Sequence, residues 1–148
     1  LLIFFSLWWL YFAQELGPFL AEFQRTRTLW RNPFVFAYGH YFIFAFAAAV
    51  GAGLEIAVDM ATDHAAISDR QCSALIAIPV ALFIFSVLLT HVYFGGKSRA
   101  GALACLVGGV LVLGTIWLAS PVLPIGLICL GLVAVLVAIG TSPEPEGT

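Results

Sequence analysis

Four apolar runs, each about the length of a membrane-spanning helix, dominate the sequence. They cover residues 33–60, 72–94, 100–119 and 122–139. A helix of about 20 residues crosses the ~30 Å hydrocarbon core of a bilayer, whereas a membrane β-strand would be shorter and would alternate in polarity. A fifth run, residues 1–12, is shorter, and we expect its helix to begin upstream of Leu1. The pattern predicts an all-α, polytopic transmembrane bundle with about five membrane segments.

The composition supports a lipid-facing surface. Hydrophobic residues make up 62% of the chain and charged residues 9%, with a mean hydropathy of +1.06, which is outside the usual balance of soluble domains. The six basic residues form no long tract and no aromatic-basic platform, so nucleic acid is not an expected partner. We expect contacts with the bilayer and with other membrane subunits or further copies of the chain. The three widely spaced cysteines, Cys72, Cys105 and Cys129, are expected to be core residues.

The distribution of charge predicts an orientation. We assign residues 1–140 to one transmembrane domain and residues 141–148 to a disordered polar tail. Only one basic residue, Arg70, lies in the loop between the second and third segments. The other five lie in the two loops on the opposite side: Arg25, Arg27, Arg31, Lys97 and Arg99. The positive-inside rule then places the basic loops and the tail of this multi-pass protein in the cytoplasm.

The stretch "WWLYFAQELGP", residues 8–18, has two interpretations. In the first, residues 1–24 form one spanning helix with Glu15 near its middle and Pro18 opening the backbone beside it. In the second, which we favour, the crossing ends at about Phe12. Residues 16–30 then form an amphipathic helix on the membrane surface, because apolar side chains recur there at helical spacing. An aromatic belt at the interface would comprise Trp8, Trp9, Tyr11 and Trp30.

Several short motifs resemble one known family. "WWLYF" (8–12), "YGHYFIF" (38–44), "GLE" (53–55) and the following His64 are similar in sequence and spacing to the bacterial low temperature requirement protein A family. The resemblance implies a multi-pass protein of the bacterial inner membrane, with this chain corresponding to a C-terminal portion of longer relatives. Two features depart from the family pattern: Ala13 stands where an acidic residue usually follows the aromatic motif, and the next segment carries less charge. Any role tied to that acidic position is lost here or taken by Glu15.

The second segment carries the most informative polar residues. Glu55 and Asp59 are one helical turn apart, about 40° around the axis. Together with His40 they are candidates for a proton or cation pathway, because acidic residues within a membrane are costly and seldom idle. The alternative is an interfacial Glu55 that pairs with Arg70 or caps a neighbouring helix. His40 and His91 should lie at similar depth and could ligate one haem iron, although neighbouring tyrosines also fit a simple interfacial belt. No other cofactor is indicated.

Small residues predict close helix packing. Ala49 with Gly53 in the second segment, and Cys105 with Gly109 in the fourth, have the small-xxx-small spacing that lets helix backbones approach. No nucleophile elbow, phosphate-binding loop or zinc spacing is present in the sequence, and we expect a protein that is not an enzyme. The favoured function is a non-catalytic accessory or packing subunit of a larger membrane assembly. The alternative is part of a proton, cation or small-solute transport pathway.

Overall fold

Each apolar run forms one helix in the computed structural model, which describes residues 1–12, 33–62, 67–93, 98–118 and 120–140. The regular elements of these residues are all helical: α1 (Leu2–Phe12), α3 (Pro33–Ala61), α4 (Asp69–Tyr93), α5 (Arg99–Gly114) with the 3-10 helix η2 (Thr115–Trp117), and α6 (Val122–Gly140). Four of them are long and apolar enough to cross a membrane, and α1 is a shorter apolar helix. The predicted all-α transmembrane architecture is therefore confirmed.

Polar side chains in the loops fix where two helices begin. At the start of α4 the Ser68 hydroxyl accepts from the Gln71 backbone N–H at 3.3 Å, and the Ser68 N–H donates to the Gln71 side chain at 3.0 Å. This reciprocal capping box satisfies N–H groups that have no partner within the helix. It explains why α4 begins at Asp69, three residues before the predicted apolar run. Ser98 caps α5 in a similar way by accepting from the Gly101 N–H at 3.0 Å.

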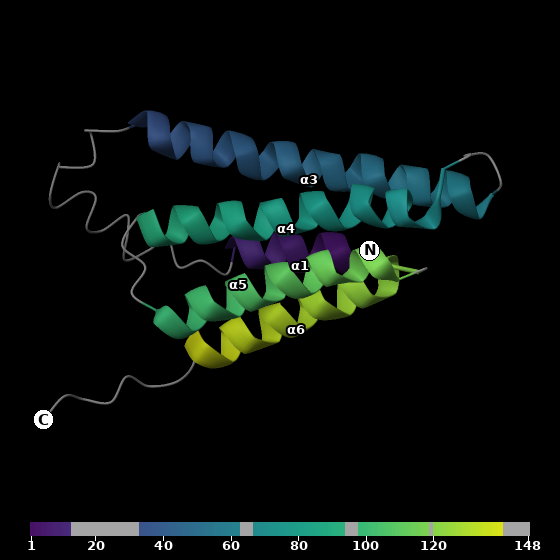
Figure 1. Cartoon of the computed structure of the whole chain (residues 1–148). Helices are drawn as coiled ribbons and strands as arrows, with labels where there is room; N and C mark the ends of the chain where they lie inside the picture. Colours follow the sequence, from purple (N-terminus) through teal and green to yellow (C-terminus); the bar gives the residue numbers. More distant parts are fainter. Residues whose placement is uncertain (13–32, 63–66, 94–97, 119, 141–148) are drawn as a thin grey trace, which may run out of the picture.

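The helices α1, α4, α5 and α6 surround a common core, and α3 packs mainly on α4, on the side away from α5 (Figure 1). Consecutive long helices run in opposite directions, so the ends of the bundle differ in character. We call one end the acidic end, where α3 finishes and α4 begins, because Asp59 and Asp69 lie there. We call the other end the basic end, where α4 finishes and α5 begins with Arg99.

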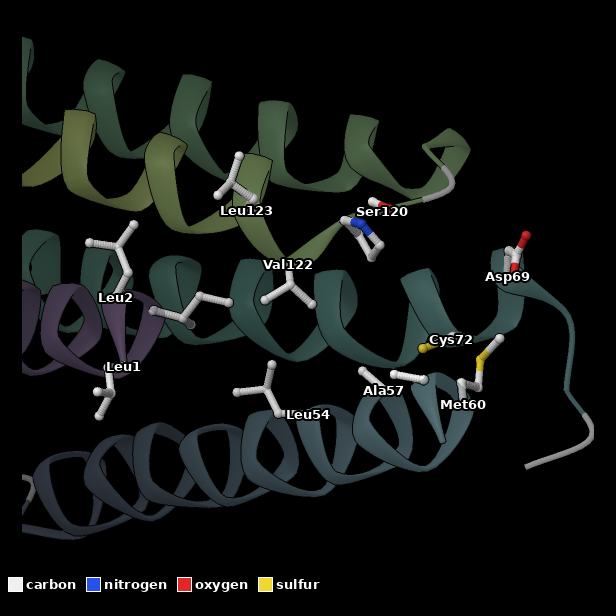
Figure 2. Close-up of a pocket in the computed structure, with 13 residues that line it drawn as sticks. Leu1, Leu2, Leu54, Ala57, Met60, Asp69, Cys72, Ser120, Val122 and Leu123 are labelled. Atoms are coloured by element: carbon white, nitrogen blue, oxygen red, sulfur yellow. The ribbon is translucent and has the colours of Figure 1, made fainter. Parts of the chain in front are cut away.

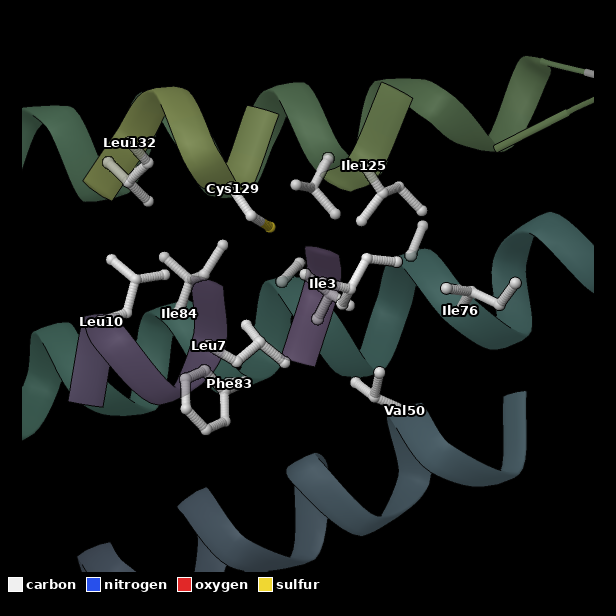
Figure 3. Packing of buried hydrophobic residues seen from close by; sticks show 14 of the residues in the cluster. Ile3, Leu7, Leu10, Val50, Ile76, Phe83, Ile84, Ile125, Cys129 and Leu132 are labelled. Atoms are coloured by element: carbon white, nitrogen blue, oxygen red, sulfur yellow. The ribbon is translucent and has the colours of Figure 1, made fainter. Parts of the chain in front are cut away.

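The core is filled with aliphatic side chains and cysteines. Helix α1 places Ile3, Leu7 and Leu10 between α4 and α6, as Figure 3 shows, and each is at most 3% exposed. The three cysteines are buried and free, as predicted. Burial of these apolar side chains against one another leaves little polar surface in the interior of the described bundle.

The contact between α3 and α4 depends on a glycine. A Cβ on Gly53 would collide with the carbonyl oxygen and carbon of Leu75, so the two backbones approach as closely as the predicted small-residue pattern allows. Pro79, four residues after Leu75, has no N–H to donate to that carbonyl. The Leu75 carbonyl therefore receives no hydrogen bond from residue 79, and it faces the position that a Gly53 Cβ would occupy.

Some predictions concern residues outside the described parts of the chain. They are the surface helix at 16–30 with Trp30, the basic loops containing Arg25, Arg27, Arg31 and Lys97, and the polar tail. The choice between the two interpretations of residues 8–18 stays a prediction for the same reason.

Candidate functional site

The two candidate carboxylates of α3 point away from the bundle. Helix α3 turns Ile43, Val50 and Gly53 toward α4, where all three are buried. Glu55 follows Gly53 by two residues, which places it about 200° around the helix, on the opposite side. Glu55 and Asp59 are accordingly exposed, and two further exposed residues continue their stripe along α3. We call this stripe the outer α3 face; its members are Ala48, Ala52, Glu55 and Asp59.

The depth of Glu55 follows from contacts along α4. Gly53 lies level with Leu75 and Ile76, so Glu55 lies level with about Ser73 on the antiparallel α4. The Ser73 hydroxyl is 3.0 Å from the Leu118 carbonyl oxygen, which marks the turn between η2 and α6. Arg70, one turn closer to the acidic end, has its guanidinium 5.5 Å from the centre of the Trp117 ring. Because tryptophan and arginine favour the membrane interface, Glu55 lies about one helical turn, ~5 Å, below that level.

Arg70 is placed differently from the ion pair that we considered for Glu55. Its guanidinium lies over Trp117 of η2 rather than beside α3. This cation–π contact was missed by sequence reasoning, although Trp117 at the end of the fourth apolar run was a signal for an interfacial aromatic residue. Glu55 and Asp59 thus present uncovered carboxyl groups along one face of α3.

A cavity of about 590 Å³ lies at the acidic end, among the starts of α1, α4 and α6 and the end of α3 (Figure 2). Its walls are mostly apolar, with Leu54, Met60 and Val122 among them, and Asp69 is the charged residue that lines it. Glu55 and Asp59 do not belong to its lining. The cavity therefore does not join the candidate carboxylates into a polar passage through the described bundle.

The two candidate haem ligands lie at the basic end. Gly39 packs near the Thr90 hydroxyl, with 3.3 Å between that oxygen and the Cβ that Gly39 would carry. The neighbouring His40 and His91 are therefore at similar depth, as predicted. The His40 ring meets the edge of the Tyr11 ring, with 6.0 Å between centroids and an interplanar angle of 88°. No group of three or more potential metal ligands occurs among the described residues. His40 is also about 15 residues from Glu55, or ~22 Å along α3, too far to share a site with it.

The aromatic residues of the predicted belt cluster on α1. Trp8 and Trp9 are exposed and both stack near Phe5, at centroid distances of 6.4 and 6.1 Å. Tyr11 is half-buried because its ring lies between α1 and α3, 5.9 Å from the ring of Phe44. Sequence reasoning therefore found the aromatic end of α1 but missed its contact with α3, since tertiary packing decides which rings meet.

Comparison with known proteins identifies the family. The family model described as bacterial low temperature requirement A protein (LtrA) matches residues 1–139. No curated protein and no solved structure matches the chain. The match covers the helices of the described residues, up to the last residue but one of α6, and the motifs on which the resemblance was based. This membrane protein therefore belongs to the bacterial low temperature requirement A (LtrA) family.

Proposed function

We propose that the chain is a non-catalytic accessory subunit of a larger membrane assembly, and that the outer α3 face is its contact surface. The observation that carries this proposal is the exposed position of Glu55 and Asp59 on a helix that could cross a membrane. A carboxyl group in contact with lipid costs several kcal/mol at depth, and less near the interface. A neighbouring helix that offers hydrogen-bond donors at the same depth removes this cost.

The other residues of the outer α3 face support the same proposal. Ala48 and Ala52 are both exposed and four residues apart, so they lie on one side of α3. Small residues at this spacing let a second helix approach closely enough for extensive van der Waals contact. The interior of the described bundle, by contrast, is packed with apolar side chains, which suits a packing subunit better than an enzyme.

Substitution of one small residue on each of two uncovered helix faces tests the proposal. Ala52→Phe adds a ring to the outer α3 face, while Ala134→Phe adds the same ring to an exposed position on α6. Complexes extracted from cell membranes in a mild detergent would be separated on native gels. We expect Ala52→Phe to shift the protein to a smaller species and Ala134→Phe to leave the complex intact. An unchanged complex in both variants would reject the outer α3 face as the contact surface.

A second candidate function rests on the same carboxylates. Glu55 and Asp59 are one turn apart on one face, so a partner helix could enclose them in a proton or cation pathway at the interface. Proton and cation flux would be measured in liposomes containing the intact assembly. Loss of flux in Glu55→Gln, with assembly size unchanged, would favour the pathway. Unaltered flux, or no flux in the unsubstituted protein, would favour the purely structural role.

The remaining proposals concern location and cofactor. We propose the bacterial inner membrane, with the basic end in the cytoplasm, because five of the six basic residues lie in the loops predicted for that end. Labelling of a cysteine introduced at Ser98 by a membrane-impermeant thiol reagent in intact cells tests the orientation. Haem ligation by His40 and His91 is retained as the weaker alternative to an interfacial belt. A purified protein without a Soret absorption band would reject it.

A further inference from the structure

An apolar groove separates α1 from α3, because both helices pack on α4. Its volume is about 430 Å³. Leu7, Ile43 and Phe83 form its floor, and each is at most 4% exposed; Figure 3 shows Leu7 and Phe83 close to one another. The groove is thus open to the surface along its length and has core side chains as its floor.

Aromatic side chains cross the groove at both ends. On the side of the groove that is nearer to the acidic end of the bundle, Phe4 of α1 reaches α3. Its ring lies 3.9 Å from the Cβ that Gly51 would carry. At the other end, the Tyr11 ring contacts the rings of His40 and Phe44 at centroid distances of 6.0 and 5.9 Å. Phe4 and Tyr11 are seven residues apart, so the open stretch is ~10 Å long. Packed helices need 8–10 Å between their axes, so a further helix could lie over the groove but could not enter between α1 and α3.

We propose that this groove binds one acyl chain of a phospholipid from the leaflet at the basic end. Its lining is almost wholly apolar, so it offers no partner for a polar ligand. Its volume of about 430 Å³ is nearly three times the ~150 Å³ of a cavity that holds benzene, which is room for a segment of one acyl chain. The open stretch covers about two-thirds of the ~15 Å thickness of one leaflet.

Tyr11 indicates which leaflet supplies the chain. It lines the groove at the end toward the basic end, where Tyr38, Tyr41 and Tyr93 are exposed. Tyrosines at this spacing are typical of the interface, where the ester and phosphate groups of a lipid lie. A phospholipid with its headgroup at this level can lay one chain past Tyr11 toward Phe4. The gain is dispersion contact with the groove walls, since lipid tails have no hydrophobic drive to leave other lipid tails.

Two consecutive alanines allow a matched test. Ala47 is half-buried and lines the groove, whereas Ala48 is exposed on the outer α3 face. Ala47→Phe fills the groove with a ring, and Ala48→Phe adds the same ring outside it. Each full-length protein would be released for native mass spectrometry from micelles supplemented with dioleoylphosphatidylcholine. We expect a retained one-to-one lipid adduct in the unsubstituted protein and in Ala48→Phe, and a several-fold smaller adduct in Ala47→Phe.

Other outcomes overturn the proposal. Equal adducts in all three proteins would mean that the lipid binds elsewhere on the surface, and absence of adducts would mean that the groove holds none. A dimer that Ala47→Phe abolishes, with lipid adducts unchanged, would assign the groove to a second copy of the chain. The two variants must first show the same helical circular dichroism as the unsubstituted protein.

A fluorescence experiment tests the groove without filling it. Trp8 lines the groove and Trp9 does not. Two proteins would each retain one of these tryptophans, with the remaining tryptophans replaced by phenylalanine. Both would be titrated in micelles with a phosphatidylcholine brominated in mid-chain, which quenches nearby indoles. We expect saturable quenching of Trp8 and a shallow, non-saturating decline for Trp9. Parallel curves for the two proteins would overturn the proposal, whatever the fate of the outer α3 face.

Discussion

Helices α3 and α4 are antiparallel neighbours that differ in how much of each helix is buried and in how many helices each one contacts. Half of the membrane-spanning stretch of α4 is buried, against 17% of that of α3. Helix α4 contacts every other helix of the described residues, whereas α3 packs mainly on α4. The exposed carboxyl groups Glu55 and Asp59 lie on the helix with the larger uncovered surface. The difference indicates that α4 holds the bundle together and that α3 is available for contacts outside it.

The same contrast shows why hydropathy alone does not separate the two helices. Both are apolar enough to cross a membrane. In a soluble protein, the positions that no other helix covers are polar. In a membrane protein they can be as apolar as the core, because lipid tails are as apolar as leucine side chains. What distinguishes the helices is the position of small residues and carboxylates around each axis. Gly53 lies on the side of α3 that faces α4, and Glu55 lies on the opposite side.

The largest expected effect comes from breaking the contact between the two helices. Gly53→Ala places a methyl group against the Leu75 carbonyl, which is backbone and cannot rotate away. The helices must separate, and overpacking of this kind costs about 1–3 kcal/mol. The free energy of unfolding, measured by titration with sodium dodecyl sulfate in mixed micelles, should fall by that amount.

The preceding glycine, Gly51, supplies the control for this substitution. A Cβ on Gly51 would lie 3.9 Å from the Phe4 ring, an ordinary van der Waals distance. Gly51→Ala should therefore leave the free energy of unfolding within about 0.5 kcal/mol of its original value. Equal losses in the two variants would mean that both glycines act through flexibility of α3 and not through contact with α4.

A smaller effect is expected where α4 is joined to the turn between α5 and α6. The buried Ser73 hydroxyl lies 2.8 Å from the Asp69 carbonyl oxygen and 3.0 Å from that of Leu118. Ser73→Ala removes the donor and should lower the free energy of unfolding by about 1 kcal/mol. Thr90→Ala, which removes a bond to Ser86 in the same helix, should cost less. A larger loss in Thr90→Ala would contradict a specific role for the Leu118 contact.

Sequence reasoning predicted the bounds of the helices far better than it predicted which side of each helix is covered by a neighbour. The bounds of α3 and α6 follow the apolar runs within one residue, because the length of a bilayer crossing leaves little freedom. The start of α4 was placed three residues late, because Ser68 and Gln71 extend it with polar side chains that hydropathy excludes. The pairing of Glu55 and Asp59 on one face was predictable from the 3.6-residue period.

Which helix packs against each side of α3 was not predictable in the same way. The small-residue pattern predicted close packing at Gly53, but it does not show that the neighbour there is α4 or that the Glu55 side stays open. Similarly, Arg70 was considered as a partner for Glu55 because both lie toward the acidic end, but its ring partner is Trp117, 47 residues further along the chain. Such pairings depend on how whole helices pack, which a sequence period does not encode.

The contact between Arg70 and Trp117 should contribute modestly to stability. An exposed cation–π contact adds about 0.5–1 kcal/mol. A double-mutant cycle with Arg70→Gln and Trp117→Leu, followed by unfolding in mixed micelles, should give a coupling free energy in this range. A coupling of zero would mean that the two side chains are positioned independently at the interface, and the Arg70 guanidinium would then remain available to α3.

The smallest effect is expected at the outer α3 face. Glu55 is exposed and its side chain points away from α4, so Glu55→Gln should change the free energy of unfolding of the isolated chain by no more than about 0.5 kcal/mol. The same substitution should alter assembly or flux if the carboxyl group meets a partner. A stability loss as large as that of Gly53→Ala would show that both sides of α3 contribute to the stability of this chain. The contrast between α3 and α4 would then no longer hold. If the same variant keeps its stability but loses assembly, the two sides of α3 have different roles. The Gly53 side then packs on α4, and the outer α3 face binds a partner outside the bundle.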